Sequence, residues 1–152
     1  MMDIDNFKAV NDIYGHHEGD EVLRYIADSL RQFFRRDDVV IRIGGDEFVV
    51  FIYPCSSVAA IEQKIQKISE RYLRKIEQEY PLSRSSLSFG GVKYNRTTSF
   101  LELYKRADQV LYKVKHNCKG QFKISGDEDR IKKMNWRKGL VEGRTEYVTG
   151  VV

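Results

Sequence analysis

The sequence is poor in cysteine and proline, and it has no long hydrophobic run. Cys55 and Cys118 are the two cysteines, and they form neither a metal-binding spacing nor a disulfide framework, so we expect reduced thiols. No apolar run approaches the roughly 20 residues that span a bilayer. The amino-terminal MMDIDNFK lacks the basic start and apolar core of a signal peptide. We therefore expect a cytoplasmic location, either for this chain alone or as the cytoplasmic part of a longer, membrane-attached protein.

The size and charge of the chain fit one globular domain with an anionic ligand. The length of 152 residues suits a single domain. The net charge of +4 is compatible with a phosphate-bearing ligand or with nucleic acid. Residues 126–152 carry many charges without a clean period. We therefore expect a folded domain over 1–125, followed by a tail or a linker toward further domains.

The pattern of apolar residues predicts an α+β fold. Apolar positions at i, i+3, i+4 and i+7 predict helices, and β-branched or aromatic runs predict strands. Two of the strands form a hairpin and the others are separated by helices, which favours a ferredoxin-like mixed sheet flanked by helices. Gly90-Gly91 within a strand predicts a close backbone approach. The expected elements are strand 1–4, helix 7–14, a break over 14–20, helix 23–34, strands 39–43 and 48–53, helix 58–76, strand 87–94, helix 100–114 and strand 121–124.

The stretch RIGGDEFVV places two glycines and two adjacent carboxylates between apolar runs. These runs indicate a hairpin with residues 44–47 at its turn. Asp46 and Glu47 repel each other when both are ionised, so we expect a cation close by. The alternative is a turn solvated by water, because aspartate beside glycine is common in turns.

A second acidic motif, Asp3-Ile4-Asp5, lies where the first strand gives way to a helix. Asp3 and Asp5 point to the same face of a strand. If this strand lies beside the hairpin, Asp3 and Asp46 converge. Mg²⁺ is typically held by one or two carboxylates together with substrate phosphates. The alternative is that Asp3 or Asp5 only caps the following helix.

Basic and amide side chains accompany the carboxylates. Lys8 lies one helical turn beyond the first motif, and Lys115 and Lys119 lie at the end of the last helix. Their ammonium groups could hold a triphosphate, although any single lysine is more often a solvated surface residue. Asn11 and Asp20 could together read a guanine edge, with the carboxylate accepting from N1–H and N2–H₂. Spacing alone leaves open that they are an ordinary helix residue and turn residue.

Four motifs, in order, carry a family resemblance: DIDNFKAVNDIYGHHEGDEVL, RRDDVVIRIGGDEFVV, LSFGGV and ADQVLYKVK. Over about residues 3–124 the chain resembles the GGDEF family of diguanylate cyclases. The resemblance implies a palm-type fold, similar in outline to nucleotide cyclases and polymerases. It implies a reaction that joins two GTP into cyclic di-GMP and releases two pyrophosphates. Two domains would face each other as a homodimer, and the 3′-hydroxyl of each GTP would attack the α-phosphate of the other.

The resemblance implies metal chemistry at the hairpin. Asp3 and Asp46 would ligate Mg²⁺ or Mn²⁺ together with the Ile4 carbonyl. Glu47 would assist deprotonation of the 3′-hydroxyl or support a second metal ion. The metal ions would supply Lewis acidity and bridge the nucleophile and the phosphate.

The resemblance also implies sites for substrate and product. Gly44 and Gly45 would let the backbone approach the nucleotide. Arg35 and Asp38 form an R-x-x-D motif ahead of the hairpin, where the family has an inhibitory site for cyclic di-GMP; the alternative is a charged helix end. The implied substrate-binding residues are Asn11 and Asp20 for guanine, Lys8, Lys115 and Lys119 for phosphates, and Phe7 for the shape of the pocket.

The chain departs from the family at its amino end. The helix and the Asp-x-Leu-Thr-Gly-Leu-x-Asn-Arg turn that normally precede the first strand are not seen before Met1, nor is most of that strand. We expect this either to expose apolar surface or to let a partner segment fill the gap. A catalytically silent module that binds GTP or cyclic di-GMP is therefore the alternative to an active cyclase. An RNA-binding domain is disfavoured, because strand 46–51 begins with acid where RNA-binding sheets carry lysine or arginine.

Overall fold

The computed structural model describes residues 1–53, 57–93 and 98–125. A five-stranded mixed sheet with flanking helices confirms the α+β fold that the sequence predicts. Cys55 and the predicted tail over 126–152 lie outside the described residues. The elements are β1 (Met2–Asp5), α1 (Phe7–Tyr14), α2 (His16–Phe33), β2 (Val39–Gly44), β3 (Glu47–Phe51), α3 (Val58–Glu79), a 3₁₀ turn (Pro81–Ser83), β4 (Ser86–Val92), α4 (Phe100–Asn117) and β5 (Phe122–Ser125).

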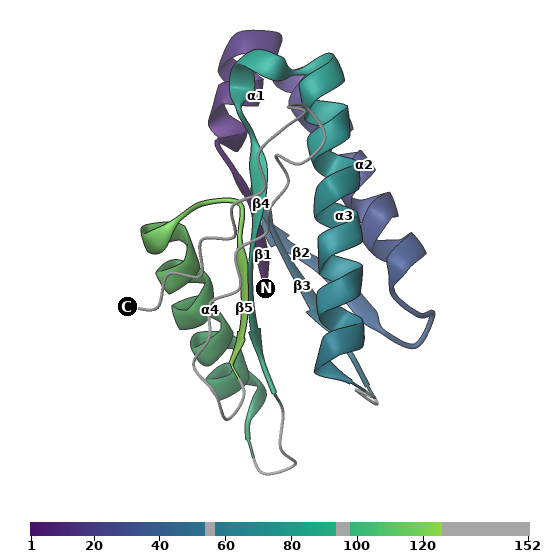
Figure 1. The fold of residues 1–152 in the computed structure, drawn as a ribbon, viewed down its shortest axis with the longest axis vertical. Coiled ribbons are helices and arrows are strands. Elements are labelled where there is room, and N and C mark those ends of the chain that lie inside the picture. The colour runs from purple at the N-terminus through teal and green to yellow at the C-terminus, as the bar shows by residue number, and fades with distance from the viewer. Residues whose placement is uncertain (54–56, 94–97, 126–152) are drawn as a thin grey trace, which may run out of the picture.

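The strands follow the order β2-β3-β1-β4-β5 across the sheet. The β4–β5 pair is parallel, and the other neighbouring pairs are antiparallel. Figure 1 shows α2 and α3 on one face of the sheet and α4 on the other, with α1 at the end of the sheet where β1 finishes. The first strand therefore occupies the centre, between the hairpin and the strand that α4 covers.

The central strand β1 is short, and it pairs with a strand on each side. Its four residues are all buried, and it pairs with both β3 and β4. Side-chain alternation sends Met2 and Ile4 into the core against α2 and α3, and it sends Asp3 and Asp5 to the face that α4 covers.

The break predicted over 14–20 is wrong in its extent. Gly15 alone interrupts the helices, with a φ of 97° that favours glycine, and α2 begins at His16. Asp20 therefore lies on a helix and not in a turn. The polar run that suggested a loop is the solvated first turn and a half of α2, and it includes Glu18 at the favourable N-terminal end of the helix.

The close approach predicted at Gly90-Gly91 is present at Gly90. A Cβ on Gly90 would lie 2.3 Å from the backbone nitrogen of Leu111 and 2.7 Å from the carbonyl oxygen of Ala107. The backbone of α4 thus rests directly on β4. Lys115 lies one helical turn beyond Leu111, so this contact fixes the height at which its side chain meets the sheet.

An apolar surface lies on the edge strand β2. Val39, Ile41 and Ile43 alternate onto one face and remain 51%, 42% and 43% exposed. Val39 pairs with Phe51 on β3, whose ring centroid lies 5.4 Å from that of Phe100 on α4. The part of the face not covered by α4 is therefore apolar. Within the described residues, no helix has the length and apolar character needed to cross a membrane.

Candidate active site

The first strand and the hairpin turn meet at the centre of the sheet. Asp3 lies directly opposite Glu47 in the β1–β3 register. Opposed residues on antiparallel strands share a face, with Cβ atoms about 5 Å apart. The N–H of Ile4 donates to the carbonyl oxygen of Asp46 at 3.3 Å. The structure thus brings Asp3, Ile4, Asp46 and Glu47 together from two neighbouring strands.

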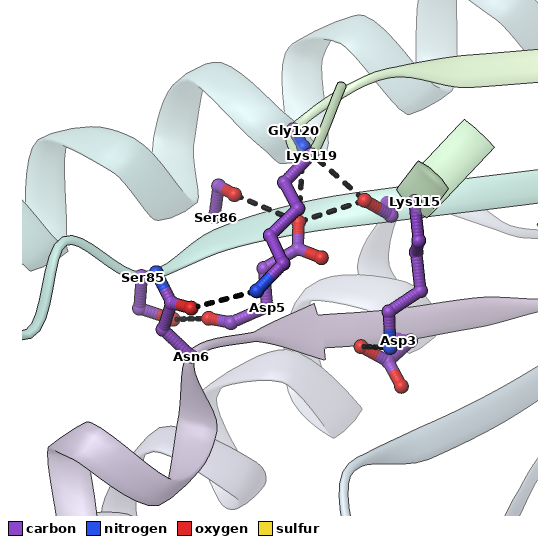
Figure 2. A network of polar contacts seen from close by, with 9 residues as sticks. Asp3, Asp5, Asn6, Ser85, Ser86, Lys115, Lys119 and Gly120 are labelled. Carbon is purple, nitrogen blue, oxygen red and sulfur yellow. Dashed lines mark hydrogen bonds and ion pairs between the residues drawn. The ribbon is translucent and has the colours of Figure 1, made fainter. Parts of the chain in front are cut away.

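A lysine from α4 completes this acidic group. Figure 2 shows the Lys115 side chain descending to Asp3, where Nζ lies 2.8 Å from Oδ1. Burial lowers the pKa of Lys115, but the hydrogen bond and charge of Asp3, together with Asp5 and Asp46, outweigh it and leave the pKa raised. Lys115 is therefore a cation paired with Asp3 and favoured by the nearby charges of Asp5 and Asp46.

The two hairpin carboxylates hold their protons more tightly than usual. Burial raises the pKa of Asp46, and the negative charge of Asp3 raises it further. Burial likewise raises the pKa of Glu47, followed by the charges of Asp3 and Asp46. Lys115 opposes both shifts without cancelling them. The cluster thus carries an excess of negative charge that an added cation would relieve.

The donors suit a hard divalent cation. In the described part of the chain, no group of three or more histidine, cysteine, aspartate or glutamate side chains forms a ready-made metal cage. Mg²⁺ seldom needs one, because it binds through one or two carboxylates, water and substrate phosphates. Asp3, Asp46 and Glu47 provide such carboxylates. The raised pKa values of Asp46 and Glu47 indicate that additional positive charge at this place would be favourable.

The hairpin turn leaves open space beside the carboxylates. Gly45 has a φ of 50°, which favours glycine, and its carbonyl accepts a hydrogen bond from Nε of Arg42 at 2.9 Å. Gly44 has no such backbone requirement, and a Cβ there would meet nothing within 4 Å. The fold itself therefore does not explain glycine at position 44, whereas close approach by a ligand would.

Asn11 and Asp20 lie near each other across the α1–α2 pair. A Cβ on Gly19 would lie 1.9 Å from Oδ1 of Asn11, so the Asn11 side chain rests against the residue that precedes Asp20. The same Cβ would lie 3.3 Å from Cζ of Phe7, which places that ring beside the amide. Asp20 also lines an open pocket between α2 and the hairpin, with Leu23, Val40 and Phe48 among its walls.

The two remaining predicted lysines, Lys119 and Lys8, differ in their contacts. Nζ of Lys119 donates to Oδ1 of Asn6 at 2.9 Å, just before α1 begins. Asn6 has a left-handed φ of 58°, and its amide also donates to the carbonyl of Arg84. Lys8 is an exposed residue in the first turn of α1. Lys115 and Lys119 are thus tied to the end of β1, and Lys8 flanks it from solvent.

Arg35 and Asp38 lie away from this group, at the other end of β2. The strand has six residues from Val39 to Gly44, so about 20 Å separates its ends. Asp38 is buried, and its Oδ2 accepts from the backbone N–H of Arg35 at 2.8 Å. The Arg35 side chain is exposed. The aspartate therefore has a structural role in closing the turn, while the arginine remains accessible.

Sequence reasoning missed two residues. Gly19 sets the α1–α2 contact at Asn11, and a lone glycine within a polar run gave no signal of it. The other is Asp5, for which the alternative role of a helix cap is wrong, because Asn6 is the N-cap residue and makes no side-chain cap bond. The Asp5 carboxylate instead accepts from Ser86, Ser88 and Gly120. The clue was the pair of serines that alternate on β4, since they share a face with the two aspartates.

Comparison with known proteins places the chain in a family. The model of the family described as "Diguanylate cyclase, GGDEF domain" matches residues 1–121. YhcK of Bacillus subtilis is 40% identical over 122 residues, which cover 75% of this chain and 32% of that protein. Diguanylate cyclase DgcS of Shewanella oneidensis is 33% identical over 127 residues, covering 82% of this chain and 41% of that protein. The chain thus spans less than half the length of these two relatives.

Solved structures agree in fold. The active GGEEF domain of a diguanylate cyclase from Vibrio cholerae superposes with a TM-score of 0.69 at 29% identity, covering 84% of this chain and 81% of that one. The GGDEF domain of DgcB from Caulobacter crescentus, in complex with c-di-GMP, gives a TM-score of 0.65 at 25% identity, covering 81% and 74%. With a family match that spans most of its length and the carboxylate-bearing hairpin in place, this chain belongs to the GGDEF family of diguanylate cyclase domains.

Proposed function

We propose that this domain, over residues 1–125, condenses two GTP molecules into cyclic di-GMP. The observation that carries the proposal is the convergence of Asp3, Asp46 and Glu47 beside Lys115. Family membership indicates the reaction class. The residues themselves supply a match, because a carboxylate cluster with raised proton affinity suits a metal-bound triphosphate. Since the substrate is GTP, we expect the domain to work in the cytoplasm.

The substrate would be held from both ends. The Asn11 side chain lies against Gly19, the residue before Asp20, and Asn11 and Asp20 offer the amide and carboxylate groups that recognise a guanine edge. Phe7 borders the amide and gives that end an apolar wall. The phosphates would meet positive charge at the far end of the nucleotide, on Lys8, Lys115 and Lys119. The open space at Gly44 and Gly45 admits the nucleotide against the hairpin backbone.

The reaction joins two bound nucleotides across a homodimer. The 3′-hydroxyl oxygen of one GTP forms a bond to the α-phosphorus of the other, the bond from that phosphorus to the oxygen shared with the β-phosphate breaks, and pyrophosphate leaves. The reciprocal attack by the second 3′-hydroxyl closes the ring and releases the second pyrophosphate. Glu47 would accept the hydroxyl proton, and its raised pKa suits that task. Asp3 and Asp46, with the Ile4 carbonyl, would hold Mg²⁺ or Mn²⁺, which supplies Lewis acidity at the phosphate when bound. Lys115 would orient the triphosphate.

Assay of cyclic di-GMP formed from GTP and Mg²⁺, over a range of protein concentrations, tests this function. Because two domains must meet, we expect product formed per domain to rise with concentration. Asp46→Ala should fold and form no product. Absence of product from the parent chain at concentrations that support self-association would overturn the enzymatic proposal.

One observation favours a second function, a silent module that binds GTP or cyclic di-GMP. The apolar surface of β2 reaches the hairpin through Ile43, which is 43% exposed. A hairpin with an uncovered flank has less support for the rigid geometry that catalysis needs. Saturable GTP binding without product at any protein concentration would identify this module. Cyclic di-GMP binding that depends on Arg35 would place its receptor site.

A further inference from the structure

A carboxylate that the proposed chemistry does not use lies beside the site. Asp5 ends β1 and is 1% exposed. Its Oδ2 accepts from Oγ of Ser86 at 2.7 Å, from Oγ of Ser88 at 2.7 Å and from the backbone N–H of Gly120 at 2.9 Å. Figure 2 shows these contacts meeting at Asp5 from β4 and from the connection that follows α4. The residue joins three segments that are distant in sequence.

The third donor reaches outside the sheet. Gly120 lies in the connection between α4 and β5, where its φ of 74° favours glycine. The N–H of Gly120 also lies 3.2 Å from Oγ of Ser88, so the two acceptors hold this turn together. Lys119 immediately precedes it and donates to Asn6, the residue after Asp5. Asp5 thus fixes the backbone from which Lys119 extends.

Packing alone does not account for a carboxylate here. The β1–β4 pair is already held by its backbone ladder, in which Asp5 lies opposite Ser86. The backbone carbonyl of Asp5 accepts a separate hydrogen bond from the hydroxyl of Ser85. That hydroxyl is also hydrogen-bonded to the hydroxyl of Tyr72. Burying a carboxylate carries a large desolvation cost that an apolar residue would avoid. The Asp5 side chain adds its bonds from Ser86, Ser88 and Gly120, and of these three donors only Gly120 lies outside the sheet.

We propose that Asp5 is a positioning residue for the triphosphate of bound GTP. It anchors the turn after α4, so that Lys119 and Lys115 present their ammonium groups to the phosphates from fixed positions. This proposal rests on the proposed function for the identity of the ligand. Its consequence is selective: loss of the anchor weakens the grip on phosphates and leaves guanine recognition at Asn11 and Asp20 intact.

Equilibrium binding of GTP and of GMP to the whole chain, in the presence of Ca²⁺, tests this selectivity. Asp5→Ala should lower GTP affinity about tenfold. This is the loss expected when one charge-assisted contact between a lysine ammonium group and a phosphate is removed. GMP affinity should change by less than about twofold, because the selectivity lies in the outer phosphates. Asp5→Asn keeps an acceptor oxygen and should restore most of the GTP affinity. Ser69→Ala, which removes a buried hydroxyl from α3, is the matched control and should change neither.

Ser88→Ala provides a second route if Asp5→Ala fails to fold. It removes one donor to Asp5 and one acceptor of the Gly120 amide, and it should show the same selective loss of GTP affinity. Amide hydrogen exchange over 118–121, measured without nucleotide, should accelerate in either variant. Equal losses for GTP and GMP, or unchanged exchange and unchanged GTP affinity, would overturn the positioning role. Failure of the parent chain to bind GTP would instead overturn the proposed function on which it rests.

Discussion

The ammonium nitrogen of Lys115 lies 2.8 Å from Oδ1 of Asp3, a carboxylate that is only 7% exposed. The proposed function assigns the same carboxylate to a divalent cation. Asp3 therefore has two prospective cationic partners, and a cation that binds there must share Asp3 with the lysine or release it. Release would free the lysine for a phosphate oxygen. The ion pair thus links metal binding to triphosphate binding through one carboxylate.

Replacing Lys115 should distinguish the contribution of the lysine from that of a divalent cation at Asp3. Lys115→Met leaves the buried Asp3 without its cation, so we expect the free energy of unfolding without metal to fall by about 1–2 kcal/mol. This is less than the cost at a fully buried pair, because the lysine side chain is 34% exposed. Added Mg²⁺ or Mn²⁺ should raise the melting temperature of the variant more than that of the parent chain, since it takes the vacated partner position.

Lys113→Met on the same helix is the control for loss of a lysine. Its side chain is exposed, so stability and metal response should match those of the parent chain. GTP affinity should fall for Lys115→Met alone. A Lys115→Met variant whose melting temperature gains no more from the metal ion than the parent would contradict shared use of Asp3.

Neutralising Asp46 should stabilise the protein in the absence of metal. Its raised pKa means that the folded state disfavours the ionised carboxyl relative to the unfolded state. This penalty is complete at neutral pH and disappears as the pH falls below the ordinary pKa of aspartate. We therefore expect Asp46→Asn to gain about 0.5 kcal/mol at pH 7 and nothing near pH 3, because the charges involved are partly screened by solvent. Thermal unfolding at several pH values in a chelating buffer measures the effect.

The same variant should lose its stabilisation by Mg²⁺ together with its activity. Asp28→Asn removes an exposed carboxylate from α2 and serves as the control, with no stability gain and an unchanged metal response. An Asp46→Asn variant that is less stable than the parent in chelator would show that the carboxylate helps to hold the fold, and would contradict its role as a metal ligand kept at a cost in stability.

The fold could be predicted because local patterns carried it. The β-branched and aromatic run in β3 and the i, i+3, i+4 spacing in α4 identified these elements, and the hairpin followed from its glycine-rich turn. The pairing of β1 with both the hairpin and β4 fixes which carboxylates meet. That pairing depends on contacts between residues far apart in sequence, so spacing alone could only suggest it.

The part that escaped sequence reasoning lies where polar residues have non-local partners. Asp5 resembled a helix cap because it precedes a helix. Its Oδ2 instead accepts hydrogen bonds from two serines and a glycine that lie 81, 83 and 115 residues further along the chain. Asp20 resembled a turn residue because its neighbours are polar. A solvated helix face and a loop have the same composition, and only the packing of α1 on α2 distinguishes them.

The contact between Gly19 and Asn11 should decide guanine recognition. A Cβ at position 19 would lie 1.9 Å from Oδ1 of Asn11, so Gly19→Ala must displace that side chain. The displaced atom is the end of a flexible side chain, and the fold should lose no more than about 1 kcal/mol. GTP affinity should fall toward that of ATP, because the amide no longer meets the base. Asn11→Ala should give the same loss of preference.

Gly15→Ser is unsuitable as a control because Gly15 has a positive φ. Ala27→Ser, about two helical turns beyond Gly19 on α2, is the control for a small increase in side-chain size. It should keep the preference for GTP. Competition binding of GTP against ATP measures the ratio for each variant. Retention of the parent preference in Gly19→Ala would show that Asn11 does not contact guanine.

The R-x-x-D pair should separate regulation from stability. Oδ2 of Asp38 accepts from the backbone N–H of Arg35, so Asp38→Ala should cost about 1–2 kcal/mol of unfolding free energy by opening the turn. Arg35→Ala removes an exposed side chain and keeps that backbone bond, so its cost in unfolding free energy should stay below about 0.5 kcal/mol.

Arg35→Ala is therefore the clean probe of the proposed inhibitory site. It should relieve inhibition by added cyclic di-GMP while the initial rate on GTP stays within about twofold of the parent. Arg36→Ala, at the exposed neighbouring position, should leave inhibition unchanged. Inhibition that persists in Arg35→Ala would mean that product acts elsewhere, with the active site itself as the first alternative because product and substrate share guanine.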